Sequence, residues 1–264
     1  MNRIDETFRR LRAKKEKALI GFLTVGFPSV KILPDLVKAL ERSGVDMLEL
    51  GIPFSDPLAD GPTIQASSQW ALQQGVTPGQ VLRLVEKLRR DKVKLPIALL
   101  TYYNPVYHYG LERFCREAKA SGVDGLIIPD LPPEEGKDLI AAARPLGLKT
   151  VFLAAPTSPV QRLKKIVRAS SGFIYYVSLT GVTGVRGKIP PGLSVQVRAV
   201  KRLTRLPVCV GFGISRPDQV RQVVKIADGA IVGSALSQVI HRAGRNPVKE
   251  AARFMRQMKA ASCN

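Results

Sequence analysis

The chain has 264 residues, of which 45% are hydrophobic, and a formal net charge of +20. Its length is typical of one α/β barrel, which needs about 250 residues. No apolar stretch reaches the roughly 20 residues of a membrane span, and the first residues lack the apolar core of a signal peptide. We therefore expect a soluble, cytoplasmic protein without a membrane partner.

Few residues of this chain suit metal or redox chemistry. It contains two histidines and three cysteines, Cys115, Cys209 and Cys263, which are far apart and show no metal-ligand spacing. We expect reduced thiols and no metal site.

The positive charge raises the alternative of a nucleic-acid partner, with residues 9–17 as the densest basic run. This run lacks interleaved aromatic residues, and the remaining cations are spread over most helical segments. The pattern favours a solvated basic surface that steers an anionic substrate, with no nucleic-acid partner.

Short apolar runs alternate with helical patterns along the whole chain. The runs are continuously apolar, as is typical of parallel strands covered on both faces. They occupy residues 18–25, 47–52, 96–102, 125–130, 150–155, 173–179, 207–212 and 229–233. Thr77 and Ser158, each followed by proline, are candidate helix N-caps. Eight alternations predict a single (β/α)8 TIM barrel over residues 1–264, whose basic N-terminal helix at 1–17 caps the barrel.

An internal repeat supports this fold. The sequence SGVD occurs at residues 43–46 and 121–124, each time directly before an apolar run, and residues 226–235 repeat the pattern more loosely. The repeat indicates a recurring β/α unit and says nothing about a reaction.

Carboxylates follow the second predicted strand, where barrel active sites gather at the carboxyl ends of strands. Glu49 stands inside the apolar run, so burial favours its neutral form and should raise its pKa toward the range useful for proton transfer. The alternative is an ion pair with a basic side chain of a neighbouring loop. Asp60, in the following loop, is the second candidate acid, although an aspartate in such a loop is often only a turn residue.

Glycines follow the last two predicted strands. Gly211 and Gly213 precede a helix that should begin near Pro217, and Gly233 and Ser234 begin another. Glycine backbone amides, a serine hydroxyl and a helix N-terminus are suited to a phosphate group. The glycine-rich segment at 180–187 is either a mobile lid or a plain flexible loop. No lysine lies within the strand runs, which argues against a Schiff-base aldolase.

Five stretches together resemble the alpha subunit of tryptophan synthase, in order along nearly the whole chain. They are LELGIPFSDPLADGPTIQ (48–65), YYNPVYHYG (102–110), PDLPPEE (129–135), GVTG (181–184) and GFGIS (211–215). The resemblance implies a lyase that cleaves indole-3-glycerol phosphate to indole and glyceraldehyde 3-phosphate in a retro-aldol-type reaction, in tryptophan biosynthesis, without its own cofactor or metal.

The resemblance also implies roles for individual residues. Glu49, Asp60 and Tyr175 match catalytic positions, with Glu49 moving protons and Asp60 holding the indole N–H. The matching substrate pocket is formed by Phe22, Leu100, Ile127, Phe212 and the lid residue Thr183, and the matching phosphate site by Gly184, Gly213, Gly233 and Ser234.

The family works as an αββα complex, so the resemblance implies a beta subunit that carries pyridoxal phosphate. Asp56, Asn104 and Pro132 fall where the family's subunits meet. Four tyrosines at 102, 103, 107 and 109 crowd the loop after the third strand, which we interpret as a partner surface. A stand-alone lyase that releases free indole, and a non-catalytic subunit that only activates its partner, remain as alternatives.

Overall fold

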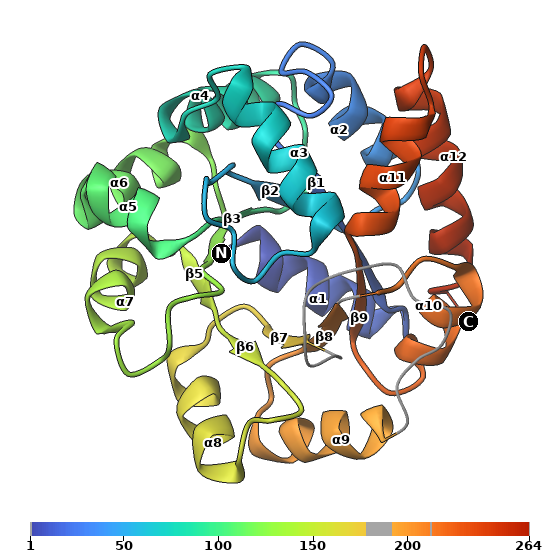
Figure 1. Cartoon of the computed structure of the whole chain (residues 1–264). Helices are drawn as coiled ribbons and strands as arrows, with labels where there is room; N and C mark the ends of the chain where they lie inside the picture. The colour runs from blue at the N-terminus through green and yellow to red at the C-terminus, as the bar shows by residue number, and fades with distance from the viewer. Residues whose placement is uncertain (1, 178–191, 212, 264) are drawn as a thin grey trace.

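The computed structural model describes residues 2–177, 192–211 and 213–263, whose strands form one parallel sheet curled into a nearly closed ring (Figure 1). Along the sheet the order is β5-β4-β3-β2-β1-β9-β8-β7-β6. The strands are β1 (Ala18–Thr24), β2 (Met47–Gly51), β3 (Ile97–Leu100), β4 (Gly125–Ile127), β5 (Lys149–Val151), β6 (Leu153–Ala154), β7 (Ile174–Val177), β8 (Val208–Gly211) and β9 (Gly229–Val232). The predicted TIM barrel is confirmed.

One predicted strand, at residues 150–155, is broken in the structure. Its first part, β5, pairs with β4, and its second part, β6, pairs with β7. Phe152 lies between them, with its carbonyl accepting the N–H of Tyr175 at 3.2 Å. The chain thus changes partner at Phe152, so the described part has nine strands instead of the predicted eight, and the ring closes there.

Helices surround the sheet on its outer side, except α1 (Arg3–Ala13), which lies across one end of the barrel (Figure 1). In the described residues they are α1 (Arg3–Ala13), α2 (Leu33–Arg42), α3 (Pro62–Gln73), α4 (Pro78–Arg90), α5 (Tyr103–Tyr109), α6 (Leu111–Ser121), α7 (Lys137–Ala143), η1 (Arg144–Leu146), α8 (Val160–Ala169), α9 (Leu193–Leu203), α10 (Pro217–Val224), α11 (Ser234–Arg242) and α12 (Pro247–Ala260). None of these helices is long and apolar enough to cross a membrane.

The two predicted N-caps differ in outcome. Thr77 caps α4, and its side chain and that of Gln80 form a complete capping box. Ser158 does not cap α8, which begins one residue later than predicted, after Pro159. The Ser158 hydroxyl instead accepts the N–H of Ala155 at 3.1 Å and so closes the turn that leads to the helix.

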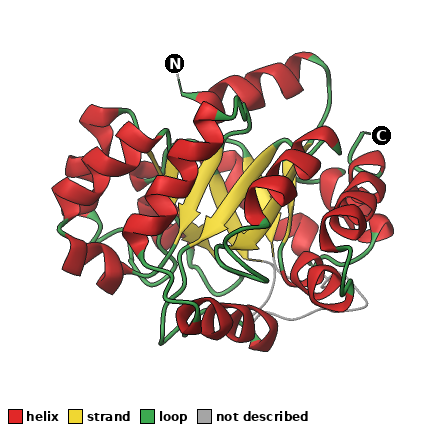
Figure 2. Ribbon diagram, turned by 90° about the horizontal axis from the view of Figure 1, so that it is seen from above, coloured by secondary structure: helices red, strands yellow, loops and turns green. Residues whose placement is uncertain are grey.

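The barrel is closed at the end where its strands begin. Helix α1 lies across that end (Figure 2), and its apolar residues Ile4, Phe8 and Leu11 join the buried cluster inside the barrel. A second, larger cluster fills the space between the strands and the outer helices. A cavity lined by Glu49 and Asp60 opens at the opposite end, where the strands terminate.

Three aspartates anchor the basic N-terminal segment, residues 3–17, and explain the repeat seen in the sequence. Asp46, Asp124 and Asp228 each precede a strand and accept a backbone N–H from the adjacent strand at 2.9–3.0 Å. Each also pairs with one cation from residues 3–17 and one from a barrel helix, namely Asp46 with Arg10 and Lys259, Asp124 with Arg3 and Arg89, and Asp228 with Lys17 and Lys201. Part of the basic N-terminal segment therefore has a structural role.

Candidate active site

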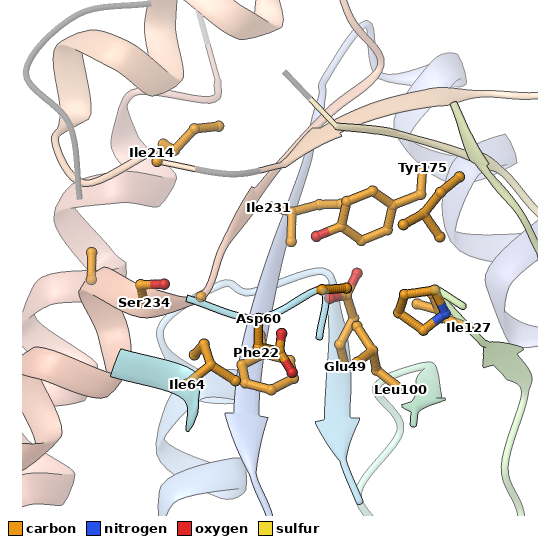
Figure 3. A pocket seen from close by; sticks show the side chains of 16 residues that line it. Phe22, Glu49, Asp60, Ile64, Leu100, Ile127, Tyr175, Ile214, Ile231 and Ser234 are labelled. Atoms are coloured by element: carbon orange, nitrogen blue, oxygen red, sulfur yellow. The ribbon is translucent and has the colours of Figure 1, made fainter. Parts of the chain in front are cut away.

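A cavity opens where the strands end, and sixteen described residues, most of them apolar, line it. An apolar pocket with a few convergent polar groups is typical of a small-molecule site. Nine of the predicted site residues line it, and they come from five strands, β1, β2, β3, β4 and β7, and from the segments that follow β2, β8 and β9 (Figure 3). They are Phe22, Glu49, Asp60, Leu100, Ile127, Tyr175, Gly213, Gly233 and Ser234. The barrel thus brings together side chains that are up to about two hundred residues apart in sequence.

Glu49 lies in the middle of β2 and is fully buried, with its side chain directed into the pocket (Figure 3). Neither carboxyl oxygen makes a hydrogen bond with any described residue. Burial raises the pKa of Glu49 from 4.5 to about 8. The alternative of an ion pair with a basic side chain is not found within the described part of the chain. Glu49 is therefore a neutral acid near pH 7, able to give up its proton.

Asp60 lies in the loop between β2 and α3, and its environment is more polar than that of Glu49. The Tyr102 hydroxyl donates a hydrogen bond of 3.0 Å to Asp60 Oδ2. Burial raises the pKa of Asp60 from 3.8 to about 6, against the opposing effect of this hydrogen bond. Near pH 7 Asp60 is thus mainly ionised while Glu49 is mainly protonated.

Tyr175 reaches the pocket from β7, with its hydroxyl directed inward (Figure 3). Burial and the nearby carboxyls of Glu49 and Asp60 raise the pKa of Tyr175 well above its usual value, so the phenol stays neutral. Gly211 makes room for the ring, because a Cβ at that position would lie 2.6 Å from the Tyr175 hydroxyl oxygen. An alanine there would displace the tyrosine.

The other side of the pocket is suited to an anion. Ser234 is the first residue of α11, with Gly233 at its N-cap, and Gly213 has a φ of +82°. The positive end of a helix, free backbone N–H groups and a hydroxyl can bind a phosphate without a cation. Of the sixteen described residues that line the cavity, the charged ones are Glu49 and Asp60. None of these sixteen residues is a cation, so among them an anion would depend on hydrogen bonds and the helix end.

Comparisons with known proteins identify this architecture. Residues 8–263 match the family model "Tryptophan synthase alpha chain". The chain belongs to the tryptophan synthase alpha chain family. It is 47% identical over 260 residues to the alpha chain of Dehalococcoides mccartyi, with 98% of each chain covered, and 50% identical over 265 residues to that of Chloroflexus aggregans, with 99% and 98% covered.

Solved structures agree with this assignment. Tryptophan synthase subunit alpha from Legionella pneumophila superposes with a TM-score of 0.92 at 38% identity, covering 99% of this chain and 98% of its own. A chain of Mycobacterium tuberculosis tryptophan synthase gives 0.91 at 37% identity, with 100% and 99% covered. The family role, an alpha subunit in tryptophan biosynthesis, therefore applies to this chain.

Three predicted site residues, Thr183, Gly184 and Phe212, lie outside the described residues. The predicted partner residues Asp56, Asn104 and Pro132 are described but do not line the cavity. Asp56 lies in the loop after β2, Asn104 in α5, and Pro132 in the loop after β4. All three thus follow neighbouring strands at the rim of the pocket.

The four tyrosines after β3 do not form one partner surface as predicted. They lie largely in a helix, α5, and Tyr107 is the one of the four that is exposed, at 65%. Tyr102 is buried and turned toward Asp60, and Tyr109 packs against Phe114 and bonds Glu117. The residues were predicted as one group because they are close in sequence. Helix α5 keeps Tyr103 and Tyr107 together, with ring centroids 5.8 Å apart, whereas Tyr102 and Tyr109 make the other contacts described.

Sequence reasoning missed several residues that complete the pocket wall. They are Ala59, Ile64, Pro129, Leu153, Ile214, Ile231 and Ala235. Leu153 and Ile231 were detectable, because alternate residues of each strand face the barrel interior and both belong to predicted strands. Pro129 stands two residues after Ile127 in the predicted run 125–130 and was detectable in the same way, although the structure places it in the loop after β4. The others lie in loops or at helix starts, where no such periodicity exists.

Proposed function

We propose that this chain is a carbon–carbon lyase that cleaves indole-3-glycerol phosphate into indole and glyceraldehyde 3-phosphate. One observation carries the proposal: the same apolar pocket holds two carboxyls in different surroundings, Glu49 without a hydrogen bond to any described residue and Asp60 bonded to the Tyr102 hydroxyl. Two acids with separated pKa values can act as proton donor and charge stabiliser at the same time.

Glu49 supplies the proton in this scheme. The neutral carboxylic acid donates its proton to the indole carbon that carries the glycerol chain, which places positive charge on the ring system. The resulting Glu49 carboxylate then removes the proton of the adjacent hydroxyl group. The carbon–carbon bond breaks, its electron pair returns to the ring, and the hydroxyl carbon becomes the aldehyde of glyceraldehyde 3-phosphate.

Asp60 stabilises the charge that develops during this step. As a carboxylate it accepts the indole N–H and lowers the energy of the cationic ring intermediate. The Tyr175 hydroxyl lies in the same pocket and orients the reacting carbon chain (Figure 3). Phe22, Leu100 and Ile127 supply apolar surface for the indole ring.

The phosphate group of the substrate binds at the other side, on Gly213, Gly233 and Ser234. Here the α11 N-terminus and the serine hydroxyl hold it by hydrogen bonds. Binding the phosphate holds the reacting carbon–carbon bond near the two carboxyls. The substrate then loses its translational and rotational freedom on binding, and this loss no longer adds to the barrier of the reaction. Thr183 and Gly184 are proposed lid and phosphate contacts from the family motif.

The chain is further proposed to act in an αββα complex, with the rim that carries Asp56, Asn104 and Pro132 facing the beta subunit. Pyridoxal phosphate would belong to that subunit, and the alpha reaction itself uses side chains alone. The exposed Tyr107 and Leu58 on the same rim are apolar enough for such a contact.

The test is release of indole from indole-3-glycerol phosphate by the purified chain and by its Glu49→Gln and Asp60→Asn variants. Both variants should lose at least about 100-fold in kcat, as expected when an acid–base group is removed. The control is Glu86→Gln, which changes an exposed carboxylate on α4, outside the pocket. Retention of wild-type rates by Glu49→Gln would contradict the proposed chemistry.

A further inference from the structure

Tyr102 makes contacts that the proposed roles do not use. We propose that Tyr102 is a positioning residue that holds the loop at 53–60 and directs one oxygen of Asp60 toward the indole N–H. This inference rests on the proposed function for its catalytic consequence, but the contact itself can be tested without turnover.

Both hydrogen bonds of the Tyr102 hydroxyl go to consecutive residues of one loop. The hydroxyl donates to Asp60 Oδ2 at 3.0 Å and accepts the backbone N–H of Ala59 at 2.9 Å. Its ring also lies 5.4 Å from the ring of Phe54, at the start of the same loop. One side chain therefore contacts this loop near its beginning and at its end.

The loop has few other attachments. Within the described residues, the remaining hydrogen bonds of residues 53–60 are local, except that Gln65 donates to the Asp60 carbonyl at 2.9 Å. That bond fixes the Asp60 backbone and leaves its carboxyl free to rotate. Leu58, in the middle of the loop, is 84% exposed. Tyr102 is thus the contact that restrains the Asp60 side chain.

Tyr102 is itself rigidly held, which a positioning residue requires. It is only 3% exposed and lies directly between β3 and α5. The next residue, Tyr103, donates its backbone N–H to both oxygens of Asp130 at 2.9 and 3.2 Å. The Tyr102 backbone is thereby fixed on both sides.

The geometry leaves one Asp60 oxygen for the ligand. Oδ2 accepts from Tyr102, and Oδ1 has no hydrogen bond to any described residue. An indole N–H is a single donor with a fixed direction, so it benefits from an acceptor whose rotation is blocked. A freely rotating carboxylate would spend part of its time facing away from the ring.

The variant that tests this is Tyr102→Phe, which removes both hydrogen bonds and keeps the ring against Phe54. The matched control is Tyr103→Phe, because the Tyr103 hydroxyl makes no hydrogen bond to a described residue. We expect Tyr102→Phe to lower kcat for indole release by about 10- to 100-fold, the usual effect of losing a hydrogen bond to a charged group, with a smaller change in KM. Tyr103→Phe should match the wild type.

A second measurement reports the contact directly. Titration of the Asp60 carboxyl by ¹³C NMR, assigned with Asp60→Asn, should show a higher midpoint in Tyr102→Phe than in the wild type, since a hydrogen bond that favours the charged form is lost. The other titratable groups that line the pocket, Glu49 and Tyr175, are unchanged in both proteins. A merely structural role for Tyr102 would not move this midpoint.

The two measurements separate the two proposals. A Tyr102→Phe protein that folds, as judged by circular dichroism, and keeps the wild-type kcat and midpoint would overturn the positioning role. If the wild type releases no indole, the proposed function fails, while a raised midpoint in Tyr102→Phe still supports the hold of Tyr102 on Asp60. An unchanged Asp60 midpoint would contradict the proposed restraint of Asp60 by Tyr102, whatever the activity of the variant.

Discussion

Replacing Glu49 by glutamine should make the protein more stable, and increasingly so as the pH rises. Glu49 has a pKa of about 8 in the folded protein against 4.5 when unfolded. Between these values the folded state holds a proton that the unfolded state has released, so the wild type loses stability as pH rises through this window. Glutamine has nearly the same shape and cannot ionise, so the free energy of unfolding of the variant should not fall in this way.

The size of the effect follows from the two pKa values. Each pKa unit corresponds to about 1.4 kcal/mol, so the advantage of the variant should grow by about 3.5 kcal/mol between pH 5 and pH 8 and level off above that. Below pH 4.5 the carboxyl is protonated in both states and contributes no pH dependence. Any constant difference between an amide and a carboxylic acid shifts the whole curve and leaves this slope intact.

The assay is urea unfolding of both proteins, followed by circular dichroism at pH 5, 6, 7 and 8. Glu86→Gln serves as a control, because it removes an exposed carboxylate on α4 in place of a buried one. A difference between Glu49→Gln and wild type that stays constant over this range, or that shrinks as pH rises, would refute the reasoning. It would mean that Glu49 is paired or solvated in the folded protein.

Three further predictions concern the rest of the barrel. Asp124→Ala should lower the free energy of unfolding by about 3–5 kcal/mol, measured by urea unfolding, because it leaves the 13%-exposed Arg89 without its carboxylate. Lys92→Gly should raise the free energy of unfolding by about 1 kcal/mol in the same assay, since Lys92 has a φ of +62° that glycine adopts without strain. An unchanged free energy of unfolding would contradict the idea that Lys92 is strained. Gly211→Ala should reduce indole release by at least about 10-fold, because its Cβ would displace Tyr175, and a normal kcat would contradict this packing.

The fold could be predicted from the sequence because its signals are local. Each apolar run and the helix after it are recognisable without reference to the remainder of the chain. The break at Phe152 was not predictable, since it depends on which strands lie on either side of residues 149–154. The start of α8 was misplaced for a related reason: the Ser158 side chain bonds back to Ala155 instead of capping the helix.

The site was predictable to a different degree at each position. Glu49 was recognisable because a carboxylate inside an apolar strand is costly unless it has a task. The contact between Tyr102 and Asp60 was not, because it joins residues 42 positions apart and depends on the direction in which the chain leaves β3. The pairing of Asp46, Asp124 and Asp228 with the basic segment 3–17 was not predictable for the same reason, although the repeat that contains these aspartates was visible.

The central claim is that this pocket cleaves indole-3-glycerol phosphate by means of Glu49 and Asp60. It is tested most directly by incubating the purified chain with this substrate, following indole release, and then adding a beta subunit. The account predicts slow release that rises sharply on addition of the beta subunit and is abolished in Glu49→Gln. Fast release unaffected by the partner would contradict the subunit role, and no release in either case would contradict the proposed reaction.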